Sequence, residues 1–148
     1  MPQNTQLQSD GRKASTIGRL AVWFLILQAT GTTLWWVVLI LYPGVRAYYL
    51  APGAPDTTLF AFAPADLASY IGGSVLVAFG LATSRSWAWP LLCVHSGAIV
   101  YSALYGLALP LFSGGGWGSL MMLPSMILEP VFAWLLRPKG RNDAGAPE

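Results

Sequence analysis

His95, Gln28 and Glu129 are polar side chains that stand inside long apolar stretches of the chain. An imidazole beside a carboxylate in a medium of low dielectric constant can move a proton or polarise a bound ligand. An ionisable side chain at membrane depth costs about 3 kcal/mol unless another group satisfies it. We therefore expect these three residues to meet, and His95 and Glu129 are the candidates for a catalytic pair.

The three residues are predicted to lie at one depth. Gln28, His95 and Glu129 are each eight or nine residues from a basic or tryptophan residue that marks one end of their apolar stretch. At 1.5 Å per helical residue, each lies roughly 12–14 Å from that boundary. The agreement predicts a polar cluster that joins three helices. A buried clasp that only fixes helix register would use the same residues, and both interpretations stay open.

Helical spacing places small hydroxyl side chains near this cluster. Thr32, Ser102 and Ser125 lie one or two helical turns from the three cluster residues, on the same helix faces. Small, weakly polar faces allow helices to pack closely and also allow a small cavity. The predicted ligand-binding residues are Gln28, Thr32, His95, Ser102, Ser125 and Glu129.

Methionines and a cysteine near the same depth raise the question of copper, since thioether ligands suit Cu(I). Cys93 and His95 are two residues apart, about 200° around a helix, so they cannot face one ion. Met121, Met122 and Met126 are interpreted as adaptable packing. We predict no metal and no cofactor. The sequence also lacks a Walker A loop, a Gly-x-Ser-x-Gly elbow, an HExxH motif and a GxGxxG motif.

The elements that position these residues are predicted to be membrane helices. The chain has 148 residues, 55% hydrophobic and 9% charged, whereas soluble domains carry roughly 25% charged residues. Four apolar stretches reach the length of about 20 residues that a helix needs to cross the hydrocarbon core. Lipid favours helices because they pair their own backbone groups. The fold class is therefore all-α, an integral-membrane four-helix transmembrane bundle.

The chain divides into one transmembrane domain between two tails. The domain is predicted over 17–137, and the polar segments 1–16 and 138–148 are predicted to be mobile cytoplasmic tails. The predicted helices cover about 20–41, 65–83, 87–109 and 117–136, with an extracytoplasmic loop over 42–64.

Two further expectations concern single side chains. Asp66 follows Pro64 and is expected in the first turn of the second helix, where the helix dipole favours a carboxylate. Trp35, Trp36 and Tyr49 are among the aromatic residues expected at the outer membrane interface, where amphipathic rings are favoured.

The basic residues predict the orientation. Seven of the eight fall on one side of a four-span arrangement, and only Arg46 falls on the other. Positive residues are retained in the cytoplasm, so the prediction is N-in/C-in, a multi-pass protein of the bacterial inner (plasma) membrane with both termini cytoplasmic. The seven are Arg12, Lys13, Arg19, Arg85, Arg137, Lys139 and Arg141.

The layout resembles the DoxX-like group of small bacterial four-helix membrane proteins. The resemblance rests on Arg19-Leu20 at the start of the first helix, Tyr42-Pro43-Gly44 at its end and Ile71-Gly72-Gly73-Ser74 in the second helix, within 17–136. It implies a four-helix membrane fold. The four helices with a polar centre also resemble sterol-isomerase-like membrane proteins, which use several acids and a histidine in a central pocket.

Three functions are compatible with these features. The first is a non-enzymatic accessory subunit or a bundle that binds an apolar ligand. The second is a proton-coupled small-molecule transporter that uses His95 and Glu129. The third is a membrane enzyme acting on a quinone, sterol or polyprenoid. Expected partners are the lipid bilayer, an apolar small molecule, and a protein partner or second copy. Nucleic acid is not expected, because the basic residues form no dense patch.

Overall fold

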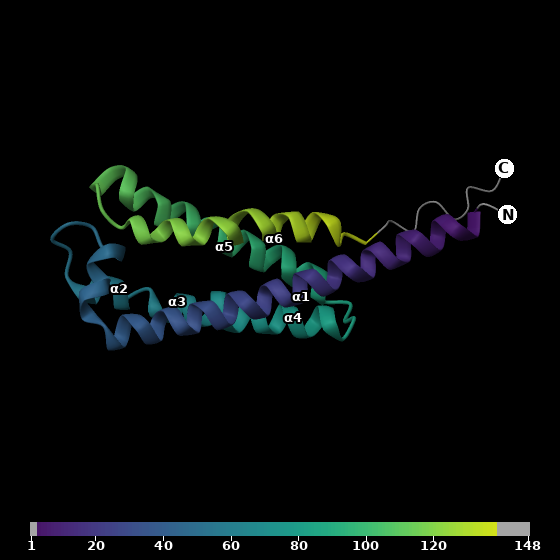
Figure 1. Cartoon of the computed structure of the whole chain (residues 1–148), viewed down its shortest axis with the longest axis horizontal. Helices are drawn as coiled ribbons and strands as arrows, with labels where there is room; N and C mark the ends of the chain where they lie inside the picture. The colour runs from purple at the N-terminus through teal and green to yellow at the C-terminus, as the bar shows by residue number, and fades with distance from the viewer. Residues whose placement is uncertain (1–2, 139–148) are drawn as a thin grey trace.

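The computed structural model describes residues 3–138 and is all-helical over that range (Figure 1). Four helical stretches are long and apolar enough to cross a membrane: Thr16–Leu41, Asp56–Ala82, Ala88–Ser113 and Trp117–Leu135. The predicted all-α class with four spans is confirmed. The N-in/C-in orientation stays a prediction.

Large apolar side chains cover the outside of the spans. Leu27, Phe79, Val94 and Ile127, one from each span, are more than half exposed. An apolar surface this extensive is unusual for a protein in water and suits contact with lipid tails.

The first helix, α1 (Gln3–Leu41), is longer than the predicted 20–41. It takes in residues 3–16 of the segment predicted to be a mobile cytoplasmic tail, so this part of the chain continues the helix. Its mobility and its location stay predictions. Once a helix is nucleated it propagates at little cost through good helix formers such as Gln, Leu, Arg, Lys and Ala, which are frequent in this segment. The predicted C-terminal tail, apart from Pro138, lies outside the described residues.

Arg46 stabilises the end of α1 from the short 3₁₀ helix η1 (Pro43–Tyr49). Its Nε donates to the carbonyl oxygen of Leu39 at 2.7 Å, and Nη2 donates to that of Ile40 at 3.2 Å. Its Nη1 also donates to Asp56 Oδ2 at 2.7 Å. A cation at a helix C-terminus offsets the negative end of the helix dipole. Arg46 therefore connects the end of the first span to the start of the second.

The second span is a composite of four segments. They are α2 (Asp56–Phe60), α3 (Ala63–Asp66), a π-helical segment η2 (Leu67–Gly73) and α4 (Ser74–Ala82). The span begins at Asp56, earlier than the predicted residue 65. Pro64 does not end the helix, because it lies in the first turn of α3, where a missing N–H is tolerated. Asp66 is therefore well inside the span, and the expectation that it opens this span is wrong.

The third and fourth spans are joined by a glycine turn. Helix α5 (Ala88–Ser113) runs past the predicted end at 109 and includes Pro110. Gly114 and Gly116 then adopt left-handed φ angles of 71° and 76°, which glycine accepts without steric cost. The fourth span starts as the 3₁₀ helix η3 (Trp117–Met122) and continues as α6 (Leu123–Leu135), which contains Pro130.

The spans pack in a closed order. Helix α1 contacts α4, α4 contacts α5, α5 contacts α6, and α6 contacts α1. Figure 1 shows the start of α1 and the end of α6 at one end of the molecule, with α2 at the other. An apolar core cluster around Leu25 and Leu92 lies on one side of the polar residues, and a second around Trp36 and Leu59 lies on the other. Polar groups and a cavity occupy the region between these two cores.

Candidate functional site: a polar cluster beside a cavity

Gln28 is the centre of a buried polar cluster. Its Nε2 donates to Glu129 Oε1 at 2.7 Å and to Ser74 Oγ at 3.1 Å. Glu129 and Ser74 are fully buried. One amide group on α1 thus binds side chains on α4 and α6, and both of its N–H donors are used.

His95 completes the cluster from α5. Its Nε2 lies 3.3 Å from Ser74 Oγ and 3.4 Å from Glu129 Oε2, and the side chain is almost wholly buried. The 3.4 Å contact is longer than an ordinary hydrogen bond. Two oxygens within reach of the same nitrogen favour the tautomer that carries its hydrogen on Nε2.

The π-helical segment makes room for the imidazole. It ends at Gly73, directly before Ser74. A Cβ atom on Gly73 would lie 2.8 Å from His95 Nδ1, closer than carbon and nitrogen can pack. Helix α5 can therefore bring His95 against the second span only because residue 73 has no side chain. Wide π turns are frequent at functional sites.

The structure brings together the three residues expected to meet. Gln28 and His95 both contact Glu129, so the three residues lie together, as their equal depths indicated. Ser74 is the member that sequence analysis missed. Its signal was its place in Ile71-Gly72-Gly73-Ser74, which was interpreted only as a glycine-rich helix start.

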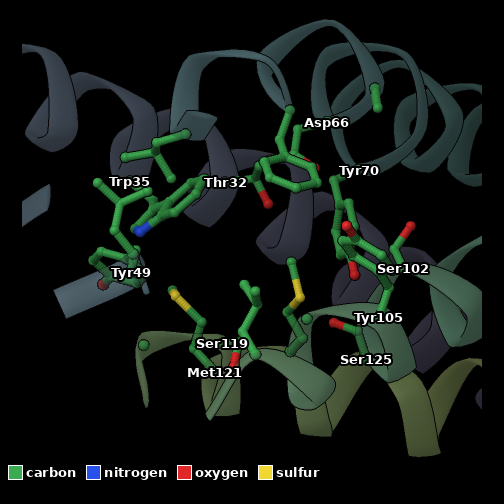
Figure 2. Close-up of a pocket in the computed structure, with 18 of the residues that line it drawn as sticks. Thr32, Trp35, Tyr49, Asp66, Tyr70, Ser102, Tyr105, Ser119, Met121 and Ser125 are labelled. Atoms are coloured by element: carbon green, nitrogen blue, oxygen red, sulfur yellow. The ribbon is translucent and has the colours of Figure 1, made fainter. Parts of the chain in front are cut away.

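A cavity of about 540 Å³ lies on the side of Gln28 toward α2 (Figure 2). All four spans contribute to its wall, together with η1 and the segment that follows it. Most of the wall is aromatic, aliphatic or glycine, and Figure 2 shows Trp35, Tyr49, Tyr105 and Met121 around it.

Four polar atoms of the lining residues are buried without a hydrogen-bond partner. They are Gln28 Oε1, Trp35 Nε1, Tyr70 OH and Ser119 Oγ. Among the described residues only one other buried side-chain atom is in this state, Glu129 Oε2 in the neighbouring cluster. Buried polar atoms are normally paired, so the packing around this cavity leaves more polar groups unsatisfied than the packing elsewhere in the described residues.

The predicted ligand-binding residues divide into two groups. Gln28, Thr32, Ser102 and Ser125 line the cavity. His95 and Glu129 are not among the lining residues, and the cluster reaches the cavity wall through Gln28, which donates to Glu129 and to Ser74. Gln28 alone belongs to both the cluster and the lining.

Several lining residues were missed because they were assigned to other roles. Trp35 and Tyr49 were expected at the outer interface, yet they line the cavity with ring centroids 5.2 Å apart. Trp36 is buried, and its indole donates to Asp66 Oδ2 at 3.2 Å. Asp66, expected to stabilise a helix start, instead lines the cavity as a buried acceptor. Tyr70 also lines the cavity and carried no sequence signal of its own.

Comparison of the chain with protein-family models, with curated proteins and with solved structures finds no match to any of them. The resemblance in layout to the DoxX-like group and to sterol-isomerase-like proteins therefore stays an expectation from sequence. Functional inference rests on the geometry of the cluster and the cavity.

Proposed function

We propose that the protein binds a largely apolar small molecule in the cavity between its four spans. The observation that carries this proposal is the cavity of about 540 Å³, whose mainly apolar wall includes a few small polar side chains, among them Thr32, Ser102 and Ser125. Binding sites for small molecules are typically about 300–1,000 Å³, mostly apolar, with a few polar groups that orient the ligand. They are common between the helices of a bundle.

In this proposal the polar cluster positions one wall of the site. Because Gln28 Nε2 donates to both Glu129 and Ser74, the amide cannot rotate freely, and the Gln28 side chain is held in the cavity wall. His95 in turn contacts both of these partners. Proton-coupled transport and catalysis by His95 and Glu129 stay predictions from sequence, as does a role as an accessory subunit.

The proposal includes the predicted location, the bacterial inner membrane, with both termini in the cytoplasm. Support comes from seven of the eight basic residues falling on the side of the termini. With this orientation the polar cluster lies near the middle of the spans, and the cavity lies toward the extracytoplasmic side.

Two glycines give a matched test of ligand binding. Gly31 lines the cavity and Gly97 does not, and an added Cβ would meet nothing within 4 Å at either position. We expect Gly31→Trp to fill part of the cavity and to lower the amount of copurifying apolar ligand at least about tenfold, the loss that follows when a bulky ring occupies the space of the ligand. We expect Gly97→Trp to leave it unchanged. Native mass spectrometry of protein released from lipid nanodiscs measures the bound ligand.

A second variant that fills the cavity controls for misfolding as the cause of ligand loss. Ser102→Phe enters the cavity from α5, so it is expected to reduce ligand as Gly31→Trp does, while size-exclusion profiles stay those of the wild type. Wild-type protein without any bound apolar molecule, or equal ligand in all four proteins, would contradict the proposed function.

A further inference from the structure

The cavity is covered at the end near η1. Leu50, which follows η1, lines the cavity and is buried, and so is Gly118 at the start of the fourth span. A Cβ atom on Gly118 would overlap the ring of Tyr49, and one on Gly115 would lie 2.6 Å from Pro52 Cδ. The segment around η1 therefore packs directly on the turn before the fourth span and closes this end of the cavity.

The opposite end is closed by the polar cluster. Gln28 lines the cavity there, and its partners Ser74 and Glu129 are fully buried behind it. The apolar core around Leu25 and Leu92 lies beyond the cluster. Neither end of the cavity therefore offers a ligand a direct path from water.

The side of the cavity between the second and third spans is different. Thr58, Phe62 and Ala65 share one face of the second span by their spacing, and Tyr101 and Tyr105 are one turn apart on α5. All five residues line the cavity and are exposed, Tyr101 by 73% and Tyr105 by 55%. The two rims face each other, since the ring centroids of Phe62 and Tyr105 are 6.0 Å apart. This side of the cavity is therefore an opening.

The opening lies at the depth of the lipid chains. Tyr105 and Tyr101 are eight and twelve residues before Ser113, where the third span ends. At 1.5 Å per residue they lie about 12 and 18 Å inside that end. The hydrocarbon core is about 30 Å thick and covers the middle of a span. The outside of the opening therefore meets hydrocarbon.

We propose that the ligand is a long-chain lipid of the bilayer, which enters sideways between the second and third spans. Its chain extends through the opening between Phe62 and Tyr105 into the membrane. A closed cavity limits the length of a ligand to its own, whereas a side opening at this depth accepts chains longer than the cavity. This inference rests on the proposed function, because it names the class of apolar molecule and its route.

Two probes that differ only in chain length test the opening. They are para-ethylbiphenyl and para-dodecylbiphenyl, added in equal amounts to the full chain in lipid nanodiscs. Native mass spectrometry measures the ratio of bound long probe to bound short probe. Because both probes compete for the same protein, the ratio does not depend on how much of the protein is folded.

Two alanines of the second span give a matched pair of variants. Ala65 and Ala68 are both exposed, and only Ala65 lines the cavity. We expect Ala65→Trp to lower the ratio of long to short probe at least about tenfold, because the indole fills the opening and the long chain must crowd into the cavity. We expect Ala68→Trp to leave the ratio unchanged. Short probe bound to Ala65→Trp shows that this variant is folded.

A change that widens the opening gives an independent measurement. Phe62→Ala removes one of the two facing rings, so we expect it to raise the ratio of long to short probe above that of the wild type. If Ala65→Trp binds neither probe, Phe62→Ala decides. A raised ratio supports the opening, and an unchanged or lower ratio contradicts it.

The first and fourth spans supply the alternative route. Gly31 and Met121 are the other exposed lining residues. If Met121→Trp lowers the ratio and Ala65→Trp does not, the ligand enters between those spans and the proposed route is wrong.

The remaining outcomes separate this inference from the function on which it rests. If the wild type binds only the short probe, or if Ala65→Trp keeps the wild-type ratio, the side opening is wrong and apolar binding stands. If the wild type binds neither probe while Gly31→Trp loses its copurifying ligand, the long-chain ligand is likewise wrong. If it binds neither probe and Gly31→Trp leaves the copurifying ligand unchanged, both proposals fail.

Discussion

At the scale of single residues, Gln28 connects two features that sequence analysis treated as one. Its amide nitrogen belongs to the buried cluster with Ser74 and Glu129, and the same residue is part of the cavity wall. His95 and Glu129 are too far back in the packing to line the cavity themselves. His95 and Glu129, the most conspicuous polar residues of the sequence, thus support the wall of the site, and other side chains line the cavity.

The contact between His95 and Glu129 predicts energetic coupling. We expect His95→Ala and Glu129→Gln each to destabilise the fold, and the double variant to be less destabilised than the sum by about 1 kcal/mol, as for polar pairs in other membrane helices. Each single change already removes the contact, so the second change cannot remove it again. Reversible unfolding in mixed micelles measures the free energy of unfolding.

Thr33 supplies the control for this cycle. Its hydroxyl donates to the carbonyl oxygen of Ala29 on its own helix and does not belong to the cluster. Thr33→Ala combined with Glu129→Gln is therefore expected to be additive. Strict additivity for His95→Ala with Glu129→Gln as well would show that the 3.4 Å contact carries no coupling.

At the scale of elements, the second span determines whether the site can form. Its π-helical segment Leu67–Gly73 turns Tyr70 toward the cavity and ends where Ser74 joins the cluster. Because Gly73 has no side chain, α5 can approach the second span closely enough for His95 to pack against residue 73. Small residues commonly let membrane helices approach one another closely. Here the glycine leaves space for the imidazole of His95.

A methyl group at residue 73 is expected to displace that imidazole. Gly73→Ala places a Cβ 2.8 Å from His95 Nδ1, so either the ring or the helix must move, which we expect to cost about 1–3 kcal/mol. Gly97→Ala on α5 meets no neighbour and gains helix propensity, so it is expected to be neutral or mildly stabilising. Thermal unfolding in detergent compares the two variants. If Gly73→Ala were as stable as Gly97→Ala, the close approach at residue 73 would be of no consequence.

Hydrophobic length predicted the four spans well, because crossing hydrocarbon imposes a minimum number of apolar residues. Depth counting also placed Gln28, His95 and Glu129 together, because helical rise is constant. The start of the second span at Asp56 was missed because the Pro-rich stretch 51–64 resembles a loop, although Pro64 is tolerated in a first turn. The sequence allowed a small cavity but did not locate its apolar wall, because a hydrophobic side chain that packs and one that faces empty space have the same pattern in sequence.

At the scale of the whole molecule, the spans close on one another in the order α1, α4, α5, α6. The first and last spans therefore touch, and the start of α1 and the end of α6 lie at the same end (Figure 1). From this end, α6 leads back to the turn that follows Ser113 at the opposite end, and α5 returns from that turn to the turn around Ser84. The turn around Ser84 therefore lies at the same end as the start of α1 and the end of α6. By their positions in the sequence, seven of the eight basic residues belong to this side and only Arg46 to the other, which supports the proposed cytoplasmic location of both termini.

Two serines at the ends of α5 test the proposed orientation. In a Cys93→Ser background, we expect Ser113→Cys to react with a membrane-impermeant maleimide added to spheroplasts, and Ser84→Cys to react only after the membrane is permeabilised. Both serines are exposed and flank a single span. Labelling of Ser84→Cys alone in intact spheroplasts would invert the proposed orientation.

The π turns of the second span also accommodate one extra residue within the helix. A π turn holds about one residue more than an α turn, so a chain one residue shorter between Asp66 and Ser74 could relax to a regular α-helix. Seven residues in π turns and six in α turns cover about the same rotation, so the residues before the deletion would keep their orientation and Asp66 would still face the Trp36 indole that donates to it. The count of seven residues between these two positions is therefore a mark that a distant relative can be checked for. A relative that lacks one of the seven is expected to keep the four spans and the hydrogen bond between the indole and the carboxylate, and to differ in the side chain that takes the place of Tyr70 in the cavity wall.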